Sequence, residues 1–210
     1  MEKKIRQSDI KRAIKDIQKL DLDLRNLGTR ATPDIVGFYG ELLAWKELKS
    51  KFGWRGYDIE FGSGQSKADI VLTKNGQRIN IEVKTSRLKH EWYGEGYGYA
   101  LNIKKCKNHL GEKFKHPKKG MISGDFCYFD YLVAVLMSDD LLSYQFYVFP
   151  RNFILKHERE LRNRNERFSS ASHRMIFIEK TSDTNEITNL DKLFIREKKK
   201  YRNAWHLIKT

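Results

Sequence analysis

Three acidic residues and one lysine form the most suggestive pattern in this sequence: Glu41, Asp69, Glu82 and Lys84. Apolar and polar side chains alternate around Asp69 and again around Glu82, which indicates two strands that each have one apolar face. Carboxylate oxygens brought close together are ligands for a hard divalent cation such as Mg²⁺. The residue types therefore predict an acidic cation site, with a lysine two positions from Glu82 on the same face of its strand.

The link between the two strands predicts how the acidic residues meet. Asn75-Gly76 is the strongest short-range signal for a two-residue hairpin turn. With this turn, Asp69 lies directly opposite Glu82, with β-carbons roughly 4.5–5.5 Å apart. The same register places only apolar side chains on the other face, whereas a slip by one residue would mix the faces. That apolar face comprises Ala68, Ile70, Leu72, Ile79, Ile81 and Val83.

The opposed carboxylates need a compensating charge, because like charges that face each other across two strands are destabilising. A shared divalent cation is the simplest source of that charge. The alternative is that Lys84, together with Lys67 opposite it, only neutralises the two acids at the surface.

Glu41 lies within a predicted helix, residues 32–53, which opens with a threonine N-cap and a proline and ends at a glycine. It borders the apolar stripe of this helix, so it either joins the acidic site or reaches past the stripe to solvent. Gly37 and Gly40 each cost the helix about 1 kcal/mol and allow another backbone or a phosphate chain to approach closely. The stripe comprises Ile35, Phe38, Leu42, Trp45 and Phe52.

Three short stretches carry these acids in order: Gly40-Glu41-Leu42-Leu43, Ala68-Asp69-Ile70-Val71 and Ile81-Glu82-Val83-Lys84-Thr85-Ser86. Their order and spacing resemble the PD-(D/E)xK nuclease superfamily, which includes restriction endonucleases, Holliday junction resolvases and related repair nucleases. Ala68 stands where the family label has its proline, a position at which many members vary. The resemblance covers residues 32–150. It implies an α/β fold with a restriction-endonuclease-like core, in which helices flank a mixed central β-sheet.

The resemblance also implies a role for each residue of the site. Asp69, Glu82 and the carbonyl group of Val83 would hold Mg²⁺, with Mn²⁺ as a substitute. Lys84 would orient or help to deprotonate the attacking water and stabilise the charge on the phosphate. Glu41 would act through a water on the metal or through a second metal. The implied reaction is phosphodiester hydrolysis, to which a metal contributes by lowering the pKa of water and screening charge.

The charge balance predicts a polyanionic partner. Lys and Arg number 41 against 27 Asp and Glu, which gives a net charge of +14. Residues 84–119 contain ten Lys or Arg and three Glu, interleaved with aromatic side chains. A lysine-rich proteome alone is the alternative, but this clustering favours double-stranded DNA. We expect four lysines to contact phosphates: Lys104, Lys105, Lys118 and Lys119.

The cysteine count and the hydropathy argue against a disulfide-rich, membrane-spanning or secreted protein. Two cysteines do not make a disulfide framework. No apolar run reaches membrane-spanning length and no secretory segment opens the chain, so we expect a cytoplasmic protein without a membrane partner. A zinc site is a weaker alternative to ordinary cysteines and histidines, because the spacing of its four candidate ligands is irregular. These are Cys106, His109, His116 and Cys127.

The chain is predicted to form a single nuclease domain, residues 1–210, in three parts. An N-terminal helix occupies 8–27 within 1–30, and the catalytic core spans 32–150 with a basic insertion at 87–125. A C-terminal extension of helix, strand and helix follows at 151–210. The expected strands beyond the hairpin are 57–61, 99–103, 130–137, 144–150 and 174–180, and the expected C-terminal helices are 151–168 and 189–209.

The family resemblance, together with the charge balance, implies a magnesium-dependent DNA endonuclease. A sequence-specific enzyme of the restriction type is favoured, because basic aromatic insertions beyond the core could read a DNA groove. A structure-selective nuclease, such as a junction resolvase or repair enzyme, is the alternative. A non-catalytic DNA-binding module with a nuclease-like fold is the alternative from another class. Cutting both strands needs two active sites or sequential nicking, so a homodimer is expected.

Overall fold

The computed structural model describes residues 6–62, 68–92, 96–104, 113–116, 120–123, 129–156, 172–180 and 200–209. Its elements are α1 (Gln7–Asn26), α2 (Pro33–Phe52), η1 (Gly53–Arg55), β1 (Asp58–Phe61), β2 (Ile70–Lys74), β3 (Gln77–Arg87), β4 (Lys89–Trp92), β5 (Gly96–Lys104), β6 (Lys113–His116), β7 (Gly120–Ser123), β8 (Tyr131–Met137), β9 (Tyr144–Pro150), α3 (Arg151–Lys156), β10 (Ser172–Lys180) and η2 (Trp205–Leu207).

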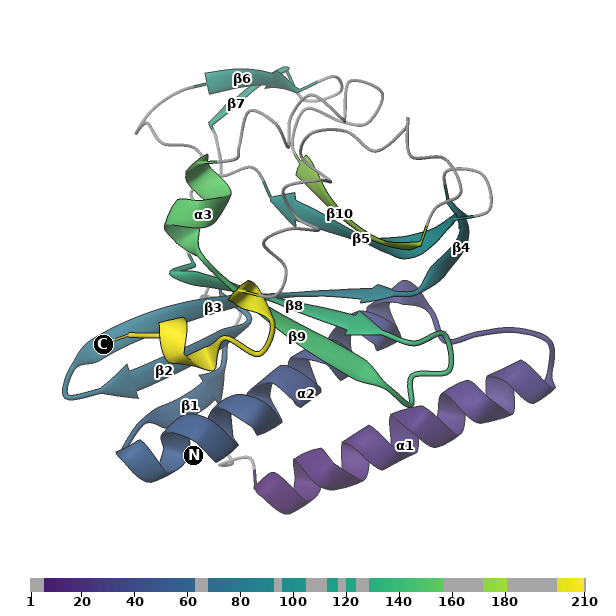
Figure 1. Ribbon diagram of the computed structural model, residues 1–210. Coiled ribbons are helices and arrows are strands. Elements are labelled where there is room, and N and C mark those ends of the chain that lie inside the picture. The colour runs from purple at the N-terminus through teal and green to yellow at the C-terminus, as the bar shows by residue number, and fades with distance from the viewer. Residues whose placement is uncertain are drawn as a thin grey trace.

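A five-stranded mixed sheet forms the centre of the fold, in the order β1-β2-β3-β8-β9. β3 and β8 run parallel, and the other neighbouring strands are antiparallel. The helices α1 and α2 lie on one side of this sheet, while β4, β5, β10 and α3 lie on the other (Figure 1). The predicted class, an α/β fold with a mixed central sheet flanked by helices, is confirmed.

The predicted hairpin register is confirmed for all five residue pairs of the ladder between β2 and β3. Ile70 pairs with Ile81, and Lys74 pairs with Gln77 across the turn. The direct pairing of Asp69 with Glu82 is not part of this ladder, which begins at Ile70. The backbone N–H of Asp69 donates to the carbonyl of Ile81, 3.1 Å away, so Asp69 still bonds to β3 although it precedes the ladder.

Helix α2 is buried on several sides and not along one stripe, because it lies between α1 and the sheet (Figure 1). Leu42, Trp45 and Phe52 are buried as predicted, but Phe38 is 50% exposed and does not belong to the core. The predicted stop at Gly53 is confirmed, since α2 ends at Phe52 with Gly53 as its C-cap. The chain then continues into η1. It reverses at Gly56, where φ is 82°.

Helix α1 packs on α2 through Ile10 and Ile14, which are buried in the same core cluster. Leu20 and Leu27, near the end of the predicted helix 8–27, are exposed, the latter by 80%. The helix ends at Asn26, and Gly28 follows it with a φ of 74°, a left-handed conformation that glycine favours after a helix.

The opposite face of the sheet has its own apolar cluster. Alternate side chains of β8 and β9, including Leu132 and Phe149, pack there against Leu101 of β5 and Phe153 of α3. The predicted buried strand at 130–137 is therefore confirmed, since both of its faces are covered.

The C-terminal segment differs from the predicted helix over 189–209. Residues 202–209 form a bridge, a turn and the short helix η2. The φ of Asn203 is 49°, outside the right-handed helical region, and its N–H donates to the carbonyl of Phe146, 2.9 Å away. Trp205 then packs on Phe146 with 5.2 Å between ring centroids. Residues 202–209 therefore contact the edge strand β9 instead of continuing the predicted helix.

Three further predicted elements lie wholly or partly within the described ranges. The expected strand at 99–103 is part of β5, and β4 and β6 show that the basic insertion contains strands and is not one long loop. The expected strand at 174–180 lies within β10, which pairs with β5. Of the expected helix 151–168, residues 151–156 form α3 and the rest lies outside the described residues.

No helix in the described ranges is long and apolar enough to span a membrane.

Candidate active site

Lys84 is the central residue of the candidate site. Its Nζ lies 2.5 Å from Glu82 Oε1 and 3.9 Å from Asp69 Oδ2. The same ammonium group donates a hydrogen bond to the carbonyl oxygen of Val83, at 3.2 Å. One positive charge is thus within 4 Å of three oxygen atoms, from Asp69, Glu82 and Val83. We call these three atoms the oxygen cluster, and they are the oxygens that the sequence predicts as metal ligands.

Asp69 is held in place by the backbone of the neighbouring strand. Its Oδ2 accepts a hydrogen bond of 2.7 Å from the N–H of Val83. Asp69 and Glu82 both lie within 4 Å of the ammonium nitrogen of Lys84, which interacts with each of them.

Glu82 and Lys84 owe their common direction to the strand period of two, which sends alternate side chains of β3 to the same face. Ile81 and Val83, on the other face, are buried in the core that includes α2. Glu82 is itself buried, although it carries a charge. A buried carboxylate requires a compensating charge, and the ammonium of Lys84 supplies it here.

Glu41 reaches the same site from α2. Burial and the negative charge of Asp69 raise the pKa of Glu41 to about 7; Lys84 opposes this shift and Glu82 adds to it. Glu41 therefore lies near enough to interact electrostatically with all three charged side chains, and it is partly buried. A carboxylate with a raised pKa among other carboxylates gains most from a nearby cation.

Gly40 explains how α2 comes so close to β3. A β-carbon at Gly40 would overlap the side chain of Thr85, whose Cγ2 would be only 3.0 Å away. The predicted close approach is confirmed at Gly40, and the approaching group is the strand that carries Glu82 and Lys84. Gly37 has no atom within 4 Å of such a β-carbon, so it serves no close contact in the described structure.

The donor set suits a hard divalent cation. Carboxylate and carbonyl oxygens are the ligands that Mg²⁺ accepts, and the Lys84 ammonium marks a point at which the oxygen cluster already stabilises positive charge. Among the residues that the structure describes, no group of three or more His, Cys, Asp or Glu side chains is arranged as a metal site. The oxygen cluster contains two such side chains and one carbonyl, and Lys84 would have to move away from Glu82 to admit a cation.

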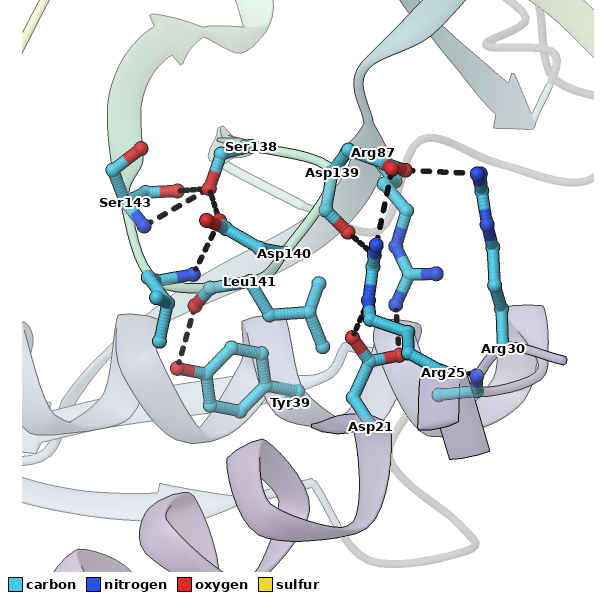
Figure 2. Close-up of polar contacts among 12 residues, drawn as sticks. Asp21, Arg25, Arg30, Tyr39, Arg87, Ser138, Asp139, Asp140, Leu141 and Ser143 are labelled. Atoms are coloured by element: carbon cyan, nitrogen blue, oxygen red, sulfur yellow. Dashed lines mark hydrogen bonds and ion pairs between the residues drawn. The ribbon is translucent and has the colours of Figure 1, made fainter. Parts of the chain in front are cut away.

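Behind the site, a network of ion pairs holds the end of β3 to α1. Asp21 is fully buried and accepts hydrogen bonds of 2.6 Å from Arg87 and 2.8 Å from Arg25 (Figure 2). Arg25 also pairs with Asp139, in the turn between β8 and β9, with 3.2 Å between Nη1 and Oδ2. Arg87 follows Lys84 by three residues on β3, so this network fixes the strand that carries the site.

A second contact ties α2 to the same turn. The hydroxyl of Tyr39 donates to the carbonyl of Leu141 at 3.3 Å (Figure 2). Burial raises the pKa of Tyr39 to about 12. α1 and α2 are therefore both anchored to the turn between β8 and β9, and β3 is joined to α1 through Arg87 and Asp21.

The predicted DNA-contacting lysines are not part of the described site. Lys104 ends β5, whereas Lys105, Lys118 and Lys119 lie outside the described residues. Of the zinc candidates, only His116 lies in a described strand, at the end of β6; Cys106, His109 and Cys127 lie outside.

Sequence reasoning missed a set of basic side chains at the other end of β3. Arg78, Arg151 and Lys209 line one cleft with Asp130. No local pattern could have found them, because they come from four distant parts of the chain.

No protein-family model matches the chain, and no curated protein matches it. Among solved structures, the chain is similar to that of a bacterial homing endonuclease, I-Ssp6803I, with 18% sequence identity and a TM-score of 0.45. The similarity covers 85% of this chain and 93% of that one. Because both the identity and the TM-score are low, the functional conclusion depends on the residues of the site itself.

Proposed function

We propose that this chain is a magnesium-dependent endonuclease that hydrolyses phosphodiester bonds in double-stranded DNA. A sequence-specific enzyme of the restriction type is the form we favour, with Mn²⁺ able to replace Mg²⁺. The observation that supports the proposal is the oxygen cluster, in which Asp69, Glu82 and the Val83 carbonyl surround one positive charge within 4 Å.

In this proposal the oxygen cluster binds the cation and Lys84 acts on the water and the phosphate. Asp69, Glu82 and the Val83 carbonyl would hold the cation, and Glu41 would support it from α2. Bound magnesium would lower the pKa of water and screen the charge that builds on the phosphate oxygens. Lys84, released from Glu82, would keep its ammonium beside the scissile phosphate. There it would orient the attacking water and stabilise the added negative charge.

The pKa of Glu41 supports its proposed role beside the cation. At about 7 it makes this carboxyl a proton acceptor that is only partly ionised near neutral pH. Positive charge entering the oxygen cluster would favour the ionised form of Glu41, so cation binding and ionisation of Glu41 would strengthen each other.

The net charge of +14 favours the proposed DNA partner. A homodimer remains part of the proposal, since two sites related by a two-fold axis could cut both strands of a duplex. Light scattering of the purified protein, alone and with duplex DNA, measures the oligomeric state.

The main experiment is cleavage of supercoiled plasmid by the wild-type chain, with magnesium, with manganese and with chelator. We expect conversion to nicked and linear DNA only when a divalent ion is present. Glu82→Gln and Asp69→Asn should abolish cleavage, because each removes one charge from the oxygen cluster. Glu47→Gln is the matched control, since Glu47 is an acid of α2 that pairs with Lys51 at 3.8 Å and should leave cleavage unchanged.

The products distinguish the forms of the proposal. Discrete fragments with one common end sequence support the restriction type. Cutting confined to branched DNA would identify a structure-selective nuclease instead. Duplex binding without cleavage in either ion would identify a non-catalytic module and overturn the proposed enzyme.

A further inference from the structure

A cleft of about 540 Å³ opens at the end of the central sheet where β3 and β8 begin and β9 ends. Its walls include Arg78 of β3, Arg151 at the start of α3 and Lys209 near the C-terminus. The cleft does not contain any residue of the oxygen cluster, and the proposed function does not use it. We call it the basic cleft.

The walls of the basic cleft are fixed by hydrogen bonds between distant segments. The carboxylate of Asp130 accepts a 2.7 Å hydrogen bond from the N–H of Asn80. The N–H of Arg151 donates to the carbonyl of Asp130 at 2.9 Å. The N–H of Lys209 donates to the hydroxyl of Tyr131 at 3.1 Å. The cleft is therefore preformed.

The charge of the cleft is positive, with three cationic side chains and one acid. The carboxylate of Asp130 accepts a hydrogen bond from a backbone N–H, which partly offsets its negative charge. Within the described part of the chain, no ion pair involves Arg151 or Lys209. Among the described residues, the buried Nε of Arg151 has no hydrogen-bond partner. The wall of the cleft therefore does not neutralise this guanidinium, and its charge favours an anion in the cleft.

The chemistry favours a phosphate group as the anion. A guanidinium presents a planar fork of donors that matches phosphate oxygens, and lysine contributes a further point charge. The cleft is open to solvent beside exposed Arg78, Asn152 and Lys209, so a phosphate within a longer chain could enter it.

The position of the cleft relates it to the candidate active site. Arg78 and Glu82 lie on β3 and point to the same face, because they are separated by an even number of residues. Four residues of strand span about 13 Å. A DNA backbone that places one phosphate at the oxygen cluster could therefore place another, a few nucleotides away, at Arg78.

We propose that the basic cleft binds a backbone phosphate of the DNA at a short distance from the bond that is cut, through Arg78, Arg151 and Lys209. This inference rests on the proposed nuclease function for its substrate, while the cleft itself is defined by its own residues. The contact would hold the DNA in register with the oxygen cluster and would be independent of sequence.

The test measures duplex binding by fluorescence anisotropy from low to moderate salt, using two unrelated sequences and chelator to prevent cleavage. Arg78→Gln and Lys209→Gln replace exposed residues and should preserve the fold, which thermal melting checks. Arg151→Lys keeps the charge of the half-buried arginine and removes its fork. The matched controls are Arg12→Gln and Lys15→Gln, which remove the same charges from α1, on the other side of the sheet.

We expect Arg78→Gln and Lys209→Gln to weaken binding to both sequences equally and each to lower the slope of log K against log salt by about one. The control variants should keep the wild-type slope. A second arm replaces single phosphates of a cleavable duplex by neutral methylphosphonates. Neutralising the phosphate that contacts Arg78 should weaken DNA binding by the wild type. The same replacement should not weaken binding by Arg78→Gln any further, because this variant already lacks the contact.

The outcomes separate the cleft from the enzyme. Normal cleavage by the wild type, with cleft variants that bind like the controls, overturns the cleft and leaves the nuclease intact. Weakened binding by the cleft variants, without wild-type cleavage in magnesium, supports the cleft and overturns the nuclease. Absence of duplex binding by the wild type overturns both. Calorimetric binding of inorganic phosphate that is lost in Arg151→Lys, while all variants bind DNA normally, would assign the cleft to a free phosphate and overturn the DNA contact.

Discussion

Lys84 neutralises two carboxylates that would otherwise repel each other. Its ammonium interacts with Asp69 and Glu82 and also donates to the Val83 carbonyl. The same side chain that stabilises the metal-free site is thus the one proposed to assist hydrolysis. This double role has a measurable consequence, because removing the ammonium should affect cleavage and cation binding in opposite directions.

The first prediction concerns Lys84→Ala. We expect the cleavage rate to fall by about 10²–10⁴-fold, the range contributed by a positioned acid–base group. Magnesium should bind at least as tightly as in the wild type, because no ammonium competes for the oxygen cluster. Single-turnover cleavage and calorimetry measure the two effects, with Lys15→Ala on α1 as the control. Near-normal cleavage by Lys84→Ala would contradict the assigned role.

The second prediction concerns Glu41→Gln. The raised pKa of Glu41, about 7, reflects burial and nearby negative charge, so the ionised side chain is unfavourable at pH 8. In chelator at pH 8, Glu41→Gln should raise the free energy of unfolding by roughly 1–2 kcal/mol. Magnesium should stabilise the wild type more than the variant, because the cation binds the folded wild-type site more tightly.

Urea unfolding with and without magnesium measures this difference. Glu47→Gln on the same helix should change stability by about 0.5 kcal/mol or less. If Glu41→Gln is the less stable protein in chelator, the side chain is a structural partner and not a repelled acid.

At the scale of elements, the crossing of α2 over β3 determines whether Glu41 can reach the site. The crossing is close because Gly40 has no side chain where Thr85 lies. Gly37 lies on the same helix and faces open space. A substitution at Gly40 therefore tests the packing of α2 on β3, whereas a substitution at Gly37 tests helix propensity alone.

The third prediction compares Gly40→Ala with Gly37→Ala. Gly40→Ala should lower the free energy of unfolding by about 1–3 kcal/mol, since the new methyl group overlaps Thr85 and must push α2 away from β3. Gly37→Ala should raise it by roughly 0.5–1 kcal/mol, because alanine favours the helix and meets no neighbour. Denaturant unfolding of both variants makes the comparison. A stabilising Gly40→Ala would show that α2 and β3 are not in close contact.

Across the whole molecule, the ion-pair network of Asp21 joins segments that are far apart in sequence. It links α1 to Arg87 of β3 and, through Arg25, to Asp139 of the turn after β8 (Figure 2). Burial alone would raise the pKa of Asp21, but hydrogen bonds from Arg25, Arg87 and the N–H of Ala31 together lower it. Removing one partner of such a buried network leaves the other charges uncompensated.

The fourth prediction concerns Asp21→Asn and its dependence on pH. At pH 7 the variant should be less stable than the wild type by about 3 kcal/mol, the cost of breaking a buried ion pair. Because the folded pKa of Asp21 is lowered, the unfolded state binds more protons at acidic pH, and stability rises with pH there. The contribution is complete above the unfolded pKa of about 3.9 and is lost as pH falls through the folded pKa.

Urea unfolding between pH 7 and pH 3 follows this contribution. The difference between wild type and Asp21→Asn should narrow below about pH 4. Asp16→Asn, an exposed acid on the same helix, should show a small difference at every pH. A constant gap between wild type and Asp21→Asn down to pH 3 would mean that charge is not what Asp21 contributes.

The sequence by itself determined the parts of this protein that depend on local periodicity. Alternation over β2 and β3, with the turn at Asn75-Gly76, determined the hairpin and its register. The helical pattern after Thr32 determined α2, and the order of the acids predicted which side chains would meet. These features are local, because a strand or helix places residues at fixed spacings whatever surrounds it.

The tertiary structure alone decided which faces are covered and which charges interact. Phe38 is exposed although it belongs to the predicted apolar stripe. Residues 202–209 leave the predicted helix because they bond to the edge strand β9. The raised pKa of Glu41 comes first from burial and then from the negative charge of Asp69, which lies in another part of the chain. The basic cleft likewise exists only where four distant segments meet. Burial and electrostatic interaction depend on distance in space, which residue spacing along the chain does not specify.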